Sequence, residues 1–127
     1  MKDPKDSTPR EAALYELARN AGALGDSQLR SFSGADQADS EVYFCERRAY
    51  VAIAAGTDVE AAIAVEDARW RAYAAEQAKK VDAAPKTKRG PMSGHSVISH
   101  RWVSPEAFAS KAIHIRTMVR IIEEKIA

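Results

Sequence analysis

The sequence predicts an all-α protein: an antiparallel bundle of four main helices with one long loop before the last helix. Apolar residues recur at helical spacing in four segments, and recognisable caps, prolines and glycines bound these segments. The connection at Gly56 is so short that it requires an antiparallel helical hairpin. We therefore expect the main helices at residues 9–22, 41–55, 58–81 and 105–125.

The first helix has a well-defined start. Thr8 is a typical N-cap residue, Pro9 fits the first helical position, and Glu11 stands where the glutamate of a capping box belongs. Because glycine often ends helices, we expect Gly22 or Gly25 to end this one. The inward stripe consists of Leu14, Leu17, Ala18 and Ala21, and a further short turn from Asp26 would bring Leu29 and Phe32 inward.

The second helix is predicted to begin between Ser33 and Ser40 and to end at Gly56. One of its faces is apolar and should point inward, whereas the opposite face is more polar. The inward residues are Val42, Cys45, Ala49, Ala52 and Ile53, and the outward residues are Tyr43, Glu46, Arg47 and Tyr50. Thr57-Asp58-Val59-Glu60 has the pattern of a second capping box, so a third helix should begin almost at once.

The third helix has two apolar faces. The bulky face consists of Val59, Ala62, Ile63, Trp70, Tyr73 and Ala74, and the small face of Ala61, Ala64, Val65, Ala68, Ala72 and Ala75. Because alanine lets a neighbouring helix approach closely, we expect this helix to be central, with neighbours on both sides. Glu66 falls on the bulky face, where we favour a buried ion pair with Arg48 over a catalytic acid.

The last helix has the pattern of a coiled-coil seam. Ser104-Pro105-Glu106 provides a cap followed by a proline. Apolar residues then follow at alternating spacings of four and three: Phe108, Ala112, Ile115, Val119, Ile122 and Ile126. Met118 and Ile121 widen this stripe, which indicates packing in a bundle or, alternatively, an interface with a second chain.

Length and composition fit a single domain of residues 1–127 with a flexible N-terminus at residues 1–7. Cys45 is the only cysteine and so cannot form an internal disulfide, which favours an intracellular setting. The N-terminus lacks the apolar stretch of a secretory signal, and no apolar run is long enough to cross a bilayer. We expect a cytoplasmic protein with no membrane association.

Charge is distributed unevenly along the chain. Residues 1–82 contain 11 Lys and Arg against 15 Asp and Glu, a net charge of −4. Residues 83–127 contain 8 Lys and Arg against 3 Asp and Glu, a net charge of +5. Either the two parts are electrostatically complementary within one fold, or the C-terminal part presents a basic surface to a polyanion.

A long break separates the third and fourth helices at residues 82–103. Connections of this length in a compact domain are typically functional loops or linkers. Residues 84–94 form a basic segment interrupted by proline and glycine. Residues 95–103 contain large apolar side chains, so we expect the far end of the loop, with Trp102 and Val103, to be docked on the bundle.

The sequence gives no clear sign of metal binding or catalysis. His95 and His100 are five residues apart, so they would point to opposite faces of a strand and diverge on a helix. His114 lies off the seam of the last helix, and Cys45 lies among inward apolar residues, where a thiol is most often a small hydrophobic group. We predict a protein that is not an enzyme and uses no metal or cofactor; a small enzyme with an unidentified site is the remotest alternative.

Cations and flat rings near the long break carry the functional hypothesis. We predict a helical binding or accessory protein that docks in a larger assembly or self-associates, with the basic loop 84–102 as the contact with a protein partner. The alternative is direct binding of nucleic acid, with cations for phosphates and rings for bases. The candidate contact residues are Lys86, Lys88, Arg89, His100, Arg101, Trp102, Arg116 and Arg120, and the candidates for an interface between chains are Met118 and Ile121. The small, alanine-rich chain also suggests an accessory protein of a phage or mobile element.

Overall fold

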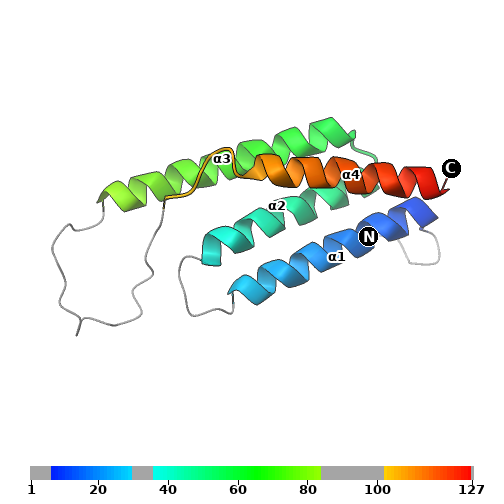
Figure 1. Ribbon diagram of the computed structural model, residues 1–127, viewed down its shortest axis with the longest axis horizontal. Coiled ribbons are helices and arrows are strands. Elements are labelled where there is room, and N and C mark those ends of the chain that lie inside the picture. Colours follow the sequence, from blue (N-terminus) through cyan, green and yellow to red (C-terminus); the bar gives the residue numbers. More distant parts are fainter. Residues whose placement is uncertain (1–6, 30–35, 84–101, 127) are drawn as a thin grey trace.

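The computed structural model of the chain describes residues 7–29, 36–83 and 102–126. These residues form four α-helices: α1 (Pro9–Leu29), α2 (Asp36–Ala54), α3 (Val59–Ala83) and α4 (Phe108–Ile126). Consecutive helices run antiparallel, and the start of α1, the turn between α2 and α3, and the end of α4 lie at the same end of the molecule (Figure 1). The predicted all-α bundle is confirmed.

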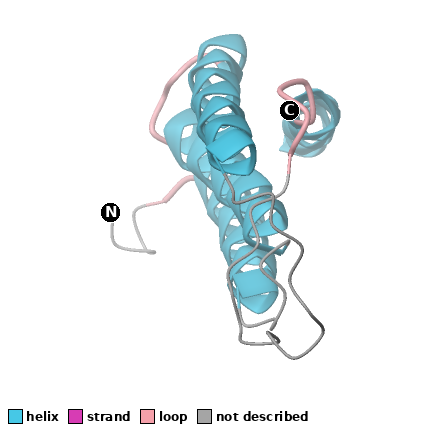
Figure 2. Cartoon of the chain, turned by 90° about the vertical axis from the view of Figure 1, so that its left-hand side faces the viewer, coloured by secondary structure: helices cyan, strands magenta, loops and turns pink. Residues whose placement is uncertain are grey.

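Helix α2 is the central helix. It packs against each of the other three, and α4 lies to one side of the remaining helices and contacts all of them (Figure 2). The prediction that the third helix is central is wrong, because the small face of α3 is exposed: Ala61, Ala64, Val65, Ala68, Ala72 and Ala75. Sequence periodicity shows that a face is apolar and small, but it does not show whether a neighbour covers that face.

Because α2 is central, residues on more than one of its sides are buried. Cys45, Ala49 and Ile53 are fully buried on the predicted inward face. Glu46 and Tyr50 were expected on an outward face, but they are 5% and 0% exposed. For these two residues the expectation fails because α4 covers the side of α2 on which they lie. Arg47, which was also expected to point outward, is exposed.

Helix α1 continues through both glycines that were expected to end it. A glycine in a helix interior costs roughly 1 kcal/mol relative to alanine, but these two glycines face α2. A Cβ atom at Gly25 would lie 2.6 Å from the Phe44 ring, and one at Gly22 would lie 3.1 Å from the Arg47 side chain. The missing side chains therefore allow α1 and α2 to approach closely, and tertiary packing overrides the local propensity.

Two of the predicted start and stop signals are correct, and a third is displaced by one residue. Thr8 caps α1, because its Oγ1 accepts a hydrogen bond of 3.1 Å from the N–H of the third helical residue. Gly56 follows the end of α2 with a φ of 110°, a conformation that favours glycine. The cap of α3 is Asp58 rather than Thr57, because the Asp58 carboxylate accepts a hydrogen bond of 3.2 Å from Ala61 N.

Several boundaries differ from the predicted ranges, and α2 begins at Asp36, before residue 41 but within the interval Ser33–Ser40. The short turn expected from Asp26 is part of α1, and Phe32 lies outside the described residues. Helix α3 extends to Ala83, one residue beyond the start of the predicted break. The last helix begins at Phe108 instead of at the preceding proline, because residues 105–107 form a separate turn closed by a backbone hydrogen bond of 3.1 Å.

All four helices contribute to the hydrophobic core. The predicted seam of α4 is buried except at its end, where Ile126 is 44% exposed. The predicted burial of Trp70 is confirmed, since its side chain is 2% exposed. Trp70 Nε1 also donates a hydrogen bond of 2.8 Å to the carbonyl oxygen of Ser104, which ties α3 to the segment that leads into α4.

Candidate functional site

A cleft opens where the chain enters α4. Its volume is about 320 Å³. The apolar wall comes from the first turns of α2, from α3 and from the segment before α4: Ala38, Val42, Trp70, Val103 and Ala107. Polar groups are contributed by Asp39, Ser104, Ser110 and Lys111, and the indole of Trp102 completes the lining. The cleft therefore combines apolar surface with a small number of polar groups, as ligand-binding clefts generally do.

The segment before α4 turns one large side chain inward and the next one outward. Val103 is 7% exposed, so its predicted docking on the bundle is confirmed. Trp102 is 64% exposed, so the same prediction is wrong for this residue. The two residues are neighbours in a segment that is not helical, and Val103 occupies the inward position. Trp102 therefore presents its indole to the surroundings beside the cleft.

Most of the cations predicted to contact a partner, and His100 with them, belong to the part of the chain that the structure does not describe. Lys86, Lys88, Arg89, His100 and Arg101 lie outside the described residues. Their contribution to a contact surface therefore remains a prediction from the sequence.

The two predicted cations on α4 have different surroundings. Arg116 donates two hydrogen bonds of 2.8 Å, from Nε and Nη2, to the Glu60 carboxylate of α3. These hydrogen bonds lower the pKa of Glu60. Arg120 is exposed and forms no ion pair with another residue in the described part of the chain. Arg116 thus joins two helices, whereas Arg120 is a surface cation.

The two residues predicted to widen the α4 stripe also differ. Met118 is half-buried and packs against the core of the bundle. Ile121 is 37% exposed, and Ile113 on the same helix is 62% exposed. Packing within one chain therefore accounts for Met118, and Ile121 presents part of its side chain at the surface.

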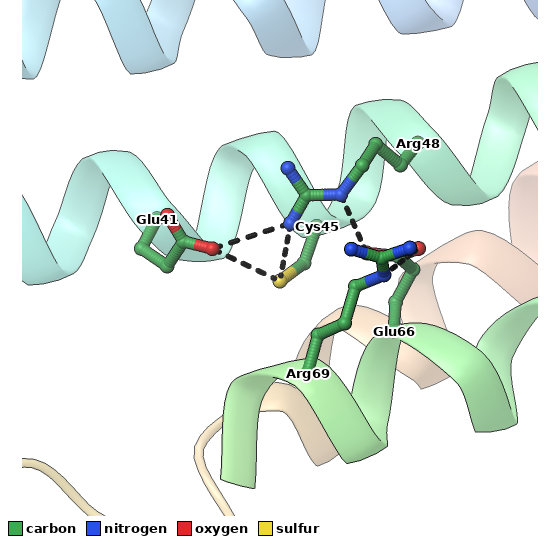
Figure 3. A network of polar contacts seen from close by, with 5 residues as sticks. All are labelled: Glu41, Cys45, Arg48, Glu66 and Arg69. Atoms are coloured by element: carbon green, nitrogen blue, oxygen red, sulfur yellow. Dashed lines mark hydrogen bonds and ion pairs between the residues drawn. The ribbon is translucent and has the colours of Figure 1, made fainter. Parts of the chain in front are cut away.

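A buried carboxylate joins α3 to α2 (Figure 3). Glu66 is 4% exposed, and Arg48 Nε donates a hydrogen bond of 2.8 Å to its Oε1, which confirms the predicted pair. Arg69, on the next turn of α3, brings its Nε to 3.3 Å from the other carboxylate oxygen. Arg48 Nη2 also donates to Glu41 Oε1 at 3.2 Å. Because Glu66 lies between two permanent cations, it serves as an ionic link between helices.

Cys45 lies beside this network with no exposed surface. Its Sγ accepts a hydrogen bond of 3.4 Å from Arg48 Nη2 and lies 3.9 Å from Glu41 Oε1 (Figure 3). Burial, and then the negative charge of Glu41, raises the pKa of the thiol to about 12. The thiol therefore remains protonated at neutral pH, which is the opposite of what a nucleophilic cysteine needs.

A second buried carboxylate joins α2 to α4. Glu46 is 5% exposed, and the Tyr50 hydroxyl donates a hydrogen bond of 3.2 Å to its Oε2. From α4, Lys111 Nζ lies 3.3 Å from Oε1, and His114 Nε2 lies 3.6 Å from Oε2. The Lys111 ammonium also lies 4.3 Å from the centre of the Tyr43 ring, in a cation–π contact. Burial, and then the negative charge of Glu46, raises the pKa of the Tyr50 hydroxyl.

Sequence reasoning missed this second cluster. The available signal was the spacing of Glu46 and Tyr50 at i and i+4 and of Lys111 and His114 at i and i+3, which places each pair on one helix face. The spacing does not reveal that the two faces meet. Lys111 also lines the cleft and so connects this cluster to the site.

The described residues do not assemble a metal centre. Within residues 7–29, 36–83 and 102–126, no group of three His, Cys, Asp or Glu side chains could hold a metal ion. His95 and His100 lie outside these ranges. In the same ranges, no helix combines the length and apolarity that crossing a bilayer requires.

The fold and the site define a four-helix bundle with an open, aromatic-lined cleft at one end. No protein-family model matches the chain, and no curated protein or solved structure is significantly similar to it. Arguments about function therefore depend on the geometry and chemistry of the site.

Proposed function

We propose that this protein is a non-enzymatic helical binding protein. It docks in a larger assembly through the end of the bundle around Trp102, and the basic segment 84–101 contributes cations to the contact. The observation that carries the proposal is the 64% exposure of Trp102, whose side chain helps to line the cleft. Tryptophan is one of the residues most enriched among those that dominate binding energy at protein interfaces, because it contributes a large contact area at a small entropic cost.

The buried titratable groups support a binding role over catalysis. Glu66 accepts a hydrogen bond from Arg48 of α2, and Glu46 forms an ion pair with Lys111 of α4. Cys45 has a raised pKa and no exposed surface. Groups with these properties stabilise and orient helices, whereas a catalytic acid or nucleophile needs access to a substrate.

Nucleic-acid binding is the second candidate, and one observation favours it. Arg101 precedes the exposed indole of Trp102 in the chain, so a cation lies within one residue of an aromatic face. Cations with flat rings are the combination that single-stranded nucleic acids require. The ion pair of Arg116 with Glu60 weakens this candidate, because it engages a cation of α4 within the fold.

Substitution of Trp102 tests the proposal. We expect Trp102→Ala to keep the parent's unfolding temperature, since an exposed side chain contributes little to stability. Affinity purification from the cells that produce the protein, quantified by mass spectrometry, should recover at least one partner about tenfold less with this variant, as expected for an interface hot spot. Lys125→Ala is the control, because it removes an exposed side chain of α4 that neither lines the cleft nor belongs to the predicted contact residues. Equal recovery of every partner by parent and Trp102→Ala would contradict the proposal.

Two further measurements separate the remaining possibilities. Size-exclusion chromatography with light scattering determines whether the partner is a second copy of the chain. The triple variant Lys86→Ala, Lys88→Ala and Arg89→Ala should remain folded and bind its partner more weakly. If that partner is nucleic acid, the slope of log affinity against log salt should fall by about one for each lost phosphate contact.

A further inference from the structure

We infer that the end of the bundle with the cleft pairs with a second copy of the chain, and that each copy inserts the indole of Trp102 into the cleft of the other. This inference rests on the proposed binding function and names the partner, which is the protein itself. The pairing is symmetric, so two identical contacts form around one two-fold axis.

The group that inserts and the recess that receives it lie on one patch of the surface. Trp102 is 64% exposed and helps to line the cleft, whereas the next residue, Val103, is 7% exposed and packs in the core. In a two-fold dimer the same patch meets itself, so that patch must contain both complementary parts. An exposed indole at an apolar recess meets this requirement.

The cleft has room for an indole. Its volume is about 320 Å³, and an enclosed apolar cavity of about 150 Å³ is enough to hold benzene. Ala38, Val42 and Ala107 provide apolar walls, and Trp70 provides an aromatic one. Aromatic rings attract one another in tilted or offset arrangements by more than their buried area accounts for. The lining therefore suits an aromatic side chain of the partner.

The walls of the cleft are held in place before a partner arrives. Trp70 Nε1 donates a hydrogen bond of 2.8 Å to the carbonyl oxygen of Ser104, which joins α3 to the segment that follows Trp102. The Ser104 hydroxyl accepts a hydrogen bond of 3.2 Å from Glu106 N, within the turn before α4. A preformed recess loses less conformational entropy on binding than a mobile one, which favours association.

The charge of the lining favours a second copy over a charged partner. Among the described residues of the lining, Lys111 is the one cation and Asp39 is the one carboxylate, so their formal charges cancel. Lys111 also forms an ion pair with the buried Glu46 of its own chain. A patch without net charge attracts neither an acidic segment nor the phosphates of a nucleic acid, but it can face its own copy without repulsion.

The area available for contact determines the expected strength of the dimer. A buried tryptophan side chain removes about 150–250 Å² from water, and a stable interface buries roughly 1,200–2,000 Å² in total. Two inserted indoles supply a minor part of that area. We therefore expect a weak dimer that forms as the protein concentration rises from micromolar to millimolar.

Sedimentation velocity over this concentration range tests the inference. The parent should change reversibly from monomer to dimer. Trp102→Ala removes the inserting group, and Ala107→Phe fills the cleft from an exposed position. Because each variant loses both contacts of the symmetric pair, we expect each to associate about 100-fold more weakly than the parent, which is about tenfold for each lost contact.

A mixture of these two variants distinguishes reciprocal insertion from simple stacking of two exposed indoles. In a mixed pair, the indole of the Ala107→Phe chain still enters the open cleft of the Trp102→Ala chain, so one of the two contacts is kept. With one variant fluorescently labelled, the mixed pair should form about tenfold more tightly than either variant with itself. Stacking of the indoles would instead leave Ala107→Phe dimeric and give no gain on mixing.

Two matched variants test other parts of the surface. Ala109→Phe makes the same change as Ala107→Phe but outside the lining, and Ile113→Ser removes another exposed large apolar side chain of α4. Both variants should dimerise as the parent does. Circular dichroism and the unfolding temperature verify that every variant is folded.

A measurement on the parent alone does not depend on any variant. In NMR spectra, the indole N–H signals of Trp102 and Trp70 should both shift with protein concentration. Trp70 is expected to respond because its ring lines the cleft that receives the indole of the second copy. A shift of neither signal across a monomer–dimer transition would place the interface elsewhere and overturn the inference.

Four further results would also overturn it. These are a parent that stays monomeric at every concentration, unchanged dimerisation of Trp102→Ala or Ala107→Phe, no gain on mixing these two variants, and a dimer that Ile113→Ser dissociates. The proposed function would still stand in each case if Trp102→Ala lost a different partner in affinity purification. The failure of the inference and the failure of the proposed function are therefore distinguishable.

Discussion

Glu66 and Glu46 are both buried on the surfaces where helices meet, but their partners differ in chemistry. Glu66 joins α3 to α2 through the guanidinium groups of Arg48 and Arg69 (Figure 3). Glu46 joins α2 to α4 through the ammonium of Lys111 and the imidazole of His114.

The comparison shows two ways of keeping a charge in a helical core. An arginine offers several N–H groups in one plane and can serve two acceptors at once, as Arg48 does for Glu66 and Glu41. Lysine presents a compact ammonium, and His114 presents one ring nitrogen to Glu46, which also accepts a hydrogen bond from the Tyr50 hydroxyl. The α2–α4 contact is therefore assembled from weaker individual contacts than the α2–α3 contact.

Breaking the arginine link should have the largest effect. Arg48→Met leaves Glu66 buried with Arg69 as its remaining cation. Because a buried carboxylate that loses its shortest hydrogen bond is costly, we expect the free energy of unfolding to fall by about 3 kcal/mol. Urea denaturation measures this loss. The double variant Arg48→Met with Glu66→Leu should recover most of it, and a single variant as stable as the parent would show that Glu66 does not depend on Arg48.

Breaking the lysine link should have a smaller effect. Lys111→Met keeps the aliphatic stem beside Tyr43 and removes the ammonium, while His114 and Tyr50 still contact Glu46. We expect a loss of about 1–2 kcal/mol in the free energy of unfolding. Urea denaturation beside Arg48→Met compares the two links directly, and a larger loss for Lys111→Met would reverse the ranking of the two clusters.

Each cluster also contains one acid that burial keeps protonated, and this leads to a prediction at alkaline pH. The pKa of Cys45 is raised from 9.0 to about 12, and that of Tyr50 is raised from 10.0. Above these unfolded values the unfolded chain loses protons that the folded chain retains, so stability falls as pH rises. Each group should lower the free energy of unfolding by up to about 1.4 kcal/mol per pH unit.

Two variants assign this alkaline loss to the clusters. Cys45→Ala should remove the part that begins above pH 9, and Tyr50→Phe the part that begins above pH 10. Urea denaturation between pH 7 and pH 11 measures the slopes, each relative to the same variant at pH 7. Slopes identical to the parent's in both variants would show that neither group is the source.

The exposed pair between α4 and α3 should have the smallest effect. Arg116 and Glu60 form two short hydrogen bonds, but both side chains are largely in water. Solvent and salt screen such pairs, so we expect Arg116→Gln to leave the midpoint of thermal unfolding unchanged within error. A shift as large as that of Lys111→Met would mean that burial does not distinguish the surface pair from the two buried clusters.

The sequence by itself determined the parts of this structure that depend on local periodicity and local capping. The four helices, the caps at Thr8 and after Gly56, and the seam of α4 follow from residue types at fixed spacing. The Arg48–Glu66 pair was also predictable, because the tight turn between α2 and α3 places the two helices side by side. In each case the interacting residues belong to one helix or to one hairpin.

The tertiary structure decided which apolar and polar faces meet. The alanine face of α3 is exposed, and α2 is central. Gly22 and Gly25 continue α1 because α2 approaches them, and Glu46 is buried because α4 covers it. The exposed indole of Trp102 beside the cleft depends on which side of a short segment reaches the core. These features arise from contacts between residues far apart in the chain. Such contacts contribute to the free energy of folding when the helices pack against one another.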